Sequence, residues 1–133
     1  MAEYTLANLK QVEDQAAKFG YAPNVEARFA TVALELEESG TGYQRLAPNF
    51  RMPFGHRHKR QEELYVVLSG GARLKLDEEV VELNPWDAVR VPPGTMRCFE
   101  AGPEGVELLA FGAPHAGPSP EEDVEMTPNW WSD

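Results

Sequence analysis

The chain has almost no cysteine and no long hydrophobic run. Its single cysteine, Cys98, cannot form a disulfide within the chain. No apolar stretch approaches the roughly 18 residues that a membrane-spanning helix requires. The N-terminal sequence MAEYTLANLKQVEDQ also lacks the basic-then-apolar order of a signal peptide. Together these absences predict a cytoplasmic protein that does not span a membrane.

Basic residues are also scarce. Twelve Lys and Arg stand against 22 Asp and Glu, which gives a formal net charge of −10. A chain this acidic repels phosphate backbones and anionic lipid surfaces, so nucleic acids and membranes are excluded as primary partners. The length of 133 residues suits one domain, and a 42% hydrophobic composition predicts a globular chain.

One helical segment is indicated, over about residues 8–19. Asn8 is a suitable N-cap, Gln11 stands where a capping box requires it, and Gly20 can end the helix in a left-handed turn. Apolar residues recur on one face at Leu9, Val12, Ala16 and Phe19. A helix this short is marginal alone, so we expect it to pack against the rest of the protein or a partner.

From residue 25 to about 112 the pattern is of short strands separated by Gly- and Pro-containing turns such as Ser69-Gly70-Gly71. Many short strands without intervening helices predict an all-β sandwich or barrel. The expected strands are residues 27–36, 42–47, 62–68, 72–76, 79–83, 88–91, 96–100 and 106–111. Residues 113–133 read as an extended acidic tail, whose Trp130 and Trp131 cover a hydrophobic patch on this subunit or on a neighbour.

Three residues in the middle of the chain carry the strongest chemical signal. His56 and His58 lie two apart, so in an extended strand their side chains share one face. Glu63 begins the next strand, and adjacent strands of a barrel can bring all three groups to one point inside it. Two imidazoles and a carboxylate suit first-row divalent metals such as Fe, Mn, Ni or Zn.

Residues 40–112 resemble the cupin family. The family's first motif, H-x-H followed by Glu and Gly, is matched by His56, His58, Glu63 and Gly70. The second motif is matched in part by Pro92-Pro93-Gly94-Thr95-Met96, with Arg97 where the family has a metal-binding histidine. The resemblance implies a jelly-roll-like double-stranded β-helix barrel with one pocket, in which a cupin of this kind lacks its fourth metal ligand.

Two models of the pocket follow. In the first, no metal is bound: Arg97 forms a bidentate pair with Glu63, and the pocket takes a small anionic or carbonyl-bearing molecule. In the second, His56, His58 and Glu63 hold a divalent metal in an open three-ligand site. The first model describes a binding protein, whereas the second describes a metal-dependent dioxygenase or isomerase, and the sequence leaves open whether the protein is an enzyme.

Two aromatic residues are expected to point to the same side of their strands as Glu63 and Arg97. Tyr65 follows Glu63 by two and Phe99 follows Arg97 by two, so both are expected to line the pocket. His115 lies beyond the last barrel strand and is expected outside it. The resemblance to a family rich in dimers predicts a homodimer, with the N-terminal helix and the Trp-bearing tail as its contacts.

Overall fold

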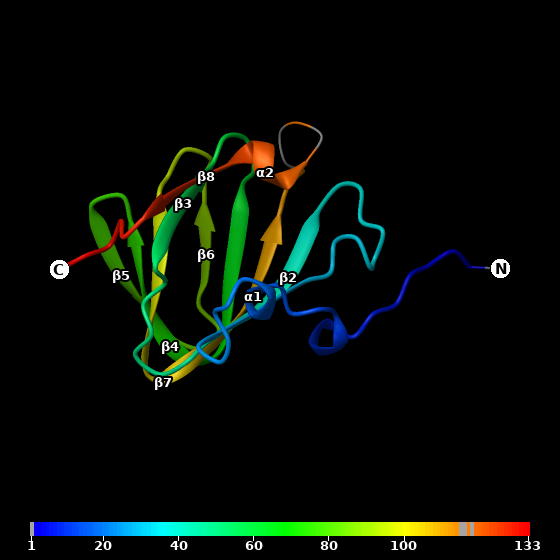
Figure 1. Cartoon of the computed structure of the whole chain (residues 1–133). Coiled ribbons are helices and arrows are strands. Elements are labelled where there is room, and N and C mark those ends of the chain that lie inside the picture. The colour runs from blue at the N-terminus through cyan, green and yellow to red at the C-terminus, as the bar shows by residue number, and fades with distance from the viewer. Residues whose placement is uncertain (1, 115–116, 118) are drawn as a thin grey trace.

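The computed structural model describes residues 2–114, 117 and 119–133 of the chain. Within these residues, an eight-stranded antiparallel sheet curls into a barrel (Figure 1). The strands are β1 (Val25–Phe29), β2 (Gly40–Leu46), β3 (Phe54–His58), β4 (Glu63–Leu76), β5 (Glu79–Leu83), β6 (Ala88–Val91), β7 (Arg97–Gly112) and β8 (Val124–Pro128). This is the all-β barrel that the strand pattern predicted.

The two longest strands, β4 and β7, lie at the centre of the barrel. They pair with each other along most of their length, from Glu63 opposite Gly112 to Leu76 opposite Arg97. One run of the sheet follows the order β1-β2-β7-β3-β8, while β5 and β6 both pair with β4. Because β4 and β7 each take part in both halves of the fold, their inward side chains face one shared interior.

Each long strand was expected as two shorter ones. The expected turn at Ser69-Gly70-Gly71 is instead an irregularity inside β4, with register shifts on either side of Gly70. Gly70 has a positive φ of 74°, and a Cβ there would lie 2.0 Å from the carbonyl oxygen of Gly105. Only glycine allows the two strands to approach this closely. The shifts keep Tyr65 and Leu74 both facing the buried core.

The N-terminal segment differs from the single helix expected over residues 8–19. It forms two separate turns, η1 (Leu9–Gln11) and α1 (Gln15–Lys18). Asn8 caps the first turn, as expected, by accepting from the amide of Lys10. Asp14 breaks the helix because its Oδ1 accepts both from the amide of Ala16 at 3.0 Å and from the amide of Ala27 at 2.9 Å. An Asp that bonds the backbone in this way competes with helix continuation.

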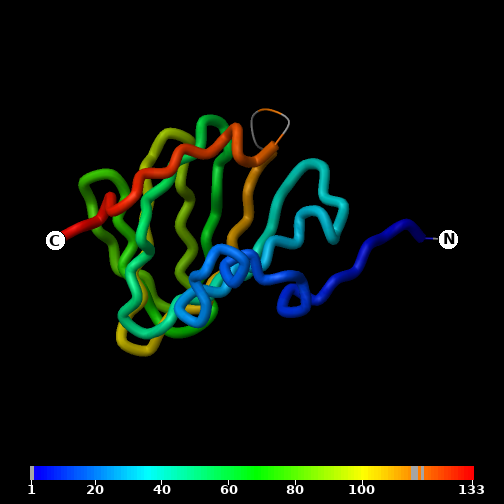
Figure 2. The backbone as a smooth tube through the Cα atoms, in the orientation of Figure 1, coloured from blue at the N-terminus to red at the C-terminus, as the bar shows by residue number. Residues whose placement is uncertain are grey.

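The predicted tail, residues 113–133, contributes to the sheet. After the short helix α2 (Pro120–Asp123), β8 pairs with the full length of β3, from Phe54 opposite Pro128 to His58 opposite Val124. Figure 2 shows this C-terminal segment lying along the barrel, whereas the N-terminal residues run away from it. Among the described residues, no helix has the length and apolarity needed to cross a membrane.

Candidate ligand-binding site

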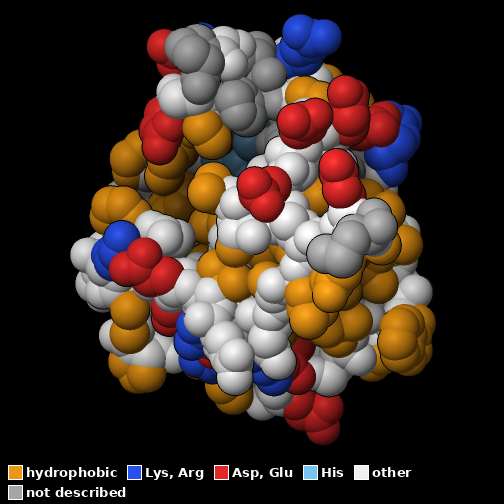
Figure 3. Space-filling model, turned by 90° about the vertical axis from the view of Figure 1, so that its right-hand side faces the viewer, with side chains coloured by type: hydrophobic (Ala, Val, Ile, Leu, Met, Phe, Trp, Pro, Cys, Tyr) orange, Lys and Arg blue, Asp and Glu red, His pale blue; other side chains and the backbone are white. Residues whose placement is uncertain are grey.

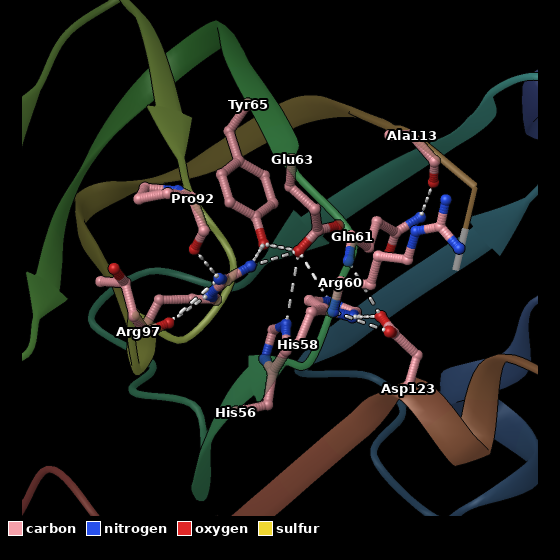
Figure 4. Close-up of polar contacts among 11 residues, drawn as sticks. His56, His58, Arg60, Gln61, Glu63, Tyr65, Pro92, Arg97, Ala113 and Asp123 are labelled. Carbon is pink, nitrogen blue, oxygen red and sulfur yellow. Dashed lines mark hydrogen bonds and ion pairs between the residues drawn. The ribbon is translucent and has the colours of Figure 1, made fainter. Parts of the chain in front are cut away.

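Strands β3 and β4 bring the three predicted residues together around one carboxylate oxygen. Glu63 Oε1 lies 3.0 Å from His58 Nε2 and 3.5 Å from His56 Nε2 (Figure 4). The two imidazole rings meet edge to face, with centroids 5.1 Å apart. The three side chains meet as expected, but not through paired strands: β3 pairs with β7 and β8, and Glu63 reaches both histidines from β4 across the barrel interior.

Arg97, the first residue of β7, donates to the same oxygen of Glu63 from Nη1 at 2.6 Å. The predicted ion pair is therefore present, but a single nitrogen makes it, so the pair is not bidentate. The other guanidinium nitrogens donate to backbone carbonyls: Nε and Nη2 to Thr95, and Nη2 also to Pro92. The Arg97 side chain is fully buried and all its nitrogens are bonded within the protein.

The predicted aromatic residues form the wall behind Glu63. Tyr65 is buried, and its hydroxyl donates to Glu63 Oε1 at 2.6 Å. Phe99 is also buried and packs edge to face on the Tyr65 ring, with centroids 5.0 Å apart. Tyr65 therefore touches the polar centre, whereas Phe99 lies one layer deeper as core. We refer to His56, His58, Glu63, Tyr65 and Arg97 as the Glu63 cluster.

Burial and hydrogen bonds shift the acidities in the Glu63 cluster. Burial alone would raise the pKa of Glu63, but hydrogen bonds from His56, His58 and Tyr65 bring that pKa well below its ordinary value. Burial raises the pKa of Tyr65, and the Glu63 charge adds to this effect. For His56, burial lowers the pKa and outweighs the opposing attraction of Glu63. The centre is thus an ionised carboxylate surrounded by donors.

Asp123, which sequence analysis did not single out, joins the cluster from the C-terminal segment. Its fully buried carboxylate lies 2.9 Å from His58 Nδ1, on the side of the ring opposite Glu63. It also accepts from the backbone amides of Arg60 and Gln61. In the sequence, Asp123 is one of three consecutive acidic residues, and nothing distinguishes it from its neighbours. Only the pairing of β8 with β3 shows that Asp123 is the one that faces His58.

The cluster opens toward solvent at His56. The His56 side chain is 26% exposed, compared with 14% for Glu63 and 11% for His58. No described residue forms a hydrogen bond with His56 Nδ1, although every buried side-chain nitrogen and oxygen of the described residues has a partner. Two surface hollows, near Glu107 and near Asn84, lie outside the cluster. His56 is therefore the member of the cluster that solvent reaches most easily.

Three members of the cluster could bind a divalent metal ion. One ligand atom from each of His56, His58 and Glu63 lies within 4.8 Å of the others. Against this, Arg97 holds the carboxylate oxygen that faces both histidines, and a guanidinium has no lone pair to offer a metal. A metal ion would stand beside a buried positive charge that acceptors of Glu63, Thr95 and Pro92 keep in place. The donor set suits a metal, but its immediate surroundings oppose one. His115, the remaining histidine, lies outside the described residues.

Comparisons with known proteins agree with the fold. The family model of the cupin domain matches residues 42–112. The uncharacterized protein MJ1618 of Methanocaldococcus jannaschii is 32% identical over 72 residues, which make up 53% of this chain and 55% of that protein. The match thus spans about half the length of this relative.

Two solved structures share the fold at low sequence identity. A cupin protein from Bacteroides fragilis is 24% identical with a TM-score of 0.70, and the match covers 90% of each chain. Oxalate decarboxylase from Bacillus subtilis is 20% identical with a TM-score of 0.72, over 92% of this chain and 33% of that enzyme. At these identities the likeness concerns the fold alone.

Proposed function

The chain belongs to the cupin domain family, and on this basis we propose that it binds a small neutral molecule at the Glu63 cluster without a metal ion. The molecule carries a carbonyl or hydroxyl group. One observation carries the proposal: the buried Arg97 donates to Glu63 at 2.6 Å, at the motif position where the resemblance places a metal-binding histidine. The cupin fold itself hosts many activities and does not decide between them.

The fixed charges favour a neutral ligand over an anionic one. The sequence predicted an anionic or carbonyl-bearing molecule, because Arg97 and the two histidines were expected to face it. In the structure the charge of Arg97 is offset by Glu63, and each of its nitrogens already has an acceptor. Freeing Arg97 for a ligand would leave the Glu63 carboxylate buried without its counter-charge, which costs about 3–5 kcal/mol.

His56 is the residue that would meet the ligand. It is the most exposed histidine of the cluster, and its Nδ1 has no hydrogen bond within the described residues. An imidazole nitrogen donates or accepts according to its tautomer, so this atom can bond a hydroxyl or a carbonyl group. Tyr65 and Phe99 behind the cluster are buried core, so a ligand would contact the cluster from the exposed side of His56.

Hydroxyacetone and pyruvate test the proposal because they share a three-carbon skeleton and differ in charge. Each would be titrated into 15N-labelled protein, and the amide signals of β3 and β4 would be followed. The proposal expects hydroxyacetone to shift signals around His56 in the native protein, and not in the His56→Ala variant. Signal shifts with pyruvate alone would show that the site prefers an anionic ligand, against the proposal. No shift with either compound would also count against the proposal.

The alternative is a divalent-metal-dependent enzyme of the dioxygenase or isomerase type. The ligand atoms of His56, His58 and Glu63 within 4.8 Å of one another favour it, and the oxalate decarboxylase neighbour shows that the fold can carry an enzyme. Fe, Mn, Ni and Zn all suit such ligands. Metal analysis of untagged protein, beside a His56→Ala/His58→Ala control, decides between the two. Near-stoichiometric metal that the control lacks would replace the metal-free proposal.

We also propose that the protein forms a homodimer. The tryptophans were expected to contact the second subunit, but Trp130 and Trp131 already pack against side chains of their own subunit. The N-terminal arm, residues 2–7, offers a different contact: Tyr4 is 80% exposed and Leu6 is 87% exposed. Figure 3 views the molecule from the side on which this arm projects, and hydrophobic side chains are exposed there among acidic ones.

A further inference from the structure

The C-terminal segment Pro120–Asp133, which we call the strap, lies along the strand that carries both histidines. Its strand β8 pairs with β3 so that Val124 stands opposite His58. Asp123, the residue before Val124, therefore arrives at the end of β3, beside the turn that leads to Glu63. Figure 4 shows its carboxylate reaching His58 from α2.

Asp123 binds the whole connection between His58 and Glu63. Its Oδ1 accepts from the amide of Arg60 at 2.9 Å, and its Oδ2 lies 2.9 Å from His58 Nδ1 and 3.3 Å from the amide of Gln61. Its backbone carbonyl accepts from the amide of Lys59 at 2.8 Å. A buried carboxylate is tolerated only when it is bonded in this way, so these contacts fix the turn 59–61 and the imidazole together.

We infer that Asp123 is a positioning residue that sets the orientation of the His58 ring, so that the strap is a working part of the binding site. A carboxylate that also accepts from backbone amides can only accept from His58, and Nδ1 therefore carries the proton of this contact. With Nδ1 fixed on Asp123, Nε2 is directed at Glu63, 3.0 Å away, and it donates to that carboxylate when the ring carries both protons. The inference concerns the same pocket and, for its effect on a ligand, rests on the proposed function.

The strap is anchored far from Asp123, at its tryptophans. The Trp131 ring lies against the guanidinium groups of Arg51 and Arg73, 4.5 and 5.2 Å from the ring centroid. The ammonium of Lys75 lies 4.5 Å from the Trp130 centroid. These contacts hold β8 in register on β3, and the register in turn decides which residue faces His58. A shift of one residue would turn the side chain of Asp123 to the opposite face.

The Asp123→Asn variant tests the inference while keeping the size of the side chain. Asparagine has one acceptor oxygen and an amide nitrogen that only donates, so it cannot serve both His58 and the amide of Arg60. Glu125→Gln is the matched control, because Glu125 lies on the same strap but pairs with the exposed Arg57 at 2.7 Å. Both variants remove one negative charge.

Long-range 1H–15N correlation spectra of the histidine rings give the readout. In the native protein, we expect a slowly exchanging proton on His58 Nδ1. This proton should be lost in Asp123→Asn and kept in Glu125→Gln, while the amide spectra show that both variants are folded. Absence of this proton from the native protein, or its persistence in Asp123→Asn, would overturn the inference. The native spectrum decides the question even if Asp123→Asn does not fold.

Binding of hydroxyacetone gives the second readout. Loss of a hydrogen bond to a charged group predicts affinity about tenfold weaker in Asp123→Asn than in Glu125→Gln. Equal affinity in the two variants would overturn a role of the strap in binding. If hydroxyacetone does not bind even the native protein, the proposed function fails, and the ring spectra still show whether Asp123 positions His58.

Discussion

The ring of Trp130 lies directly over the backbone of Gly55, the residue before His56. A Cβ at Gly55 would stand 2.7 Å from the Cε3 atom of this ring, closer than side chains pack in proteins. Because Gly55 has no side chain, the ring of Trp130 at the end of the strap can pack against the backbone of β3 next to His56. This contact links the stability of the strap to the strand that carries both histidines.

Gly55→Ala should for this reason destabilise the protein. Forcing a methyl group into a packed contact typically costs about 1–3 kcal/mol, and here the ring must move because the backbone of β3 is paired on both sides. Denaturant unfolding followed by tryptophan fluorescence measures the loss. Gly71→Ala is the control, because the nearest atom to its Cβ, the backbone oxygen of Leu83, is 3.3 Å away, which is a tight contact but a milder one than at Gly55. Equal stability of the two variants would contradict the contact.

The Arg97–Glu63 pair should be strongly coupled. Arg97→Met leaves the Glu63 carboxylate buried without its counter-charge, which predicts a loss of about 3–5 kcal/mol. Adding Glu63→Leu should recover much of that loss, because the double variant buries no unpaired charge. A double-mutant cycle by chemical denaturation measures the coupling energy.

The exposed pair Arg90–Glu62 serves as the comparison for that cycle. Its charged atoms lie 3.4 Å apart, and the side chains are 63% and 55% exposed. Exposed pairs contribute only about 0–1 kcal/mol. A coupling energy for Arg97 and Glu63 no larger than that of this surface pair would show that the buried pair does not hold the cluster together.

Much of the site follows from the sequence because strand alternation is a local rule. The spacing of His56 and His58, with Glu63 at the start of the next strand, predicted three side chains at one point, and the structure places them there. The ion pair of Arg97 with Glu63 followed from the motif position, since a buried guanidinium requires an acceptor. Its single-nitrogen geometry depends on where the carbonyls of Thr95 and Pro92 lie, which no local pattern encodes.

The parts that sequence analysis missed depend on contacts between distant segments. The single helix over residues 8–19 is broken because Asp14 bonds the amide of Ala27, a partner thirteen residues away. Asp123 reaches His58 across 65 residues, through the pairing of β8 with β3. Both side chains are ordinary acidic residues in the sequence, and the bonds that give them a role exist only in the folded chain.

Stability in acid should depend on Glu107 of β7. Its carboxylate accepts from Ser69 and from Tyr43 and lies 3.3 Å from the ammonium of Lys10. The hydrogen bond from Ser69, and then that from Tyr43, lower the pKa of Glu107 to about 2. Because the folded pKa lies below the unfolded value, this contribution is present in full above the ordinary glutamate range. It is lost as the pH falls toward 2.

The Glu107→Gln variant measures this contribution. Its deficit in unfolding free energy relative to the native protein should be largest near pH 6 and should shrink as the pH falls from about 4.5 to about 2. Glu79→Gln removes an exposed carboxylate of β5. The difference in unfolding free energy between this variant and the native protein should not shrink over the same pH range. A Glu107→Gln deficit that stays constant over this pH range would contradict the assigned hydrogen bonds.

The N-terminal arm should control association of the chain. If Tyr4 and Leu6 pack on a second copy, replacing both by serine removes apolar contact area and shifts the protein toward the monomer. Light scattering coupled to gel filtration measures the mass over a concentration series. Phe19→Ser is the control, because Phe19 is 74% exposed but lies outside the arm. A native protein that is monomeric at every concentration would refute the dimer.

Arg97→His should convert the Glu63 cluster into a metal site. The change removes the buried cation beside His56, His58 and Glu63, and it places an imidazole where the family motif has its histidine ligand. Four ligands with nitrogen and oxygen donors should hold a first-row divalent ion. Incubation with Mn, Fe, Ni or Zn followed by metal analysis should give near-stoichiometric binding in this variant and much less in the native protein.

Arg97→Gln separates the two effects of that change. Glutamine also removes the positive charge, but its amide is a poor metal ligand, so this variant should bind metal more weakly than Arg97→His. If Arg97→Gln binds as well as Arg97→His, the charge of Arg97 alone keeps metal out. If the native protein already binds metal as tightly as Arg97→His, then Arg97 does not oppose a metal ion. That result would favour the metal-dependent enzyme over the metal-free binding protein.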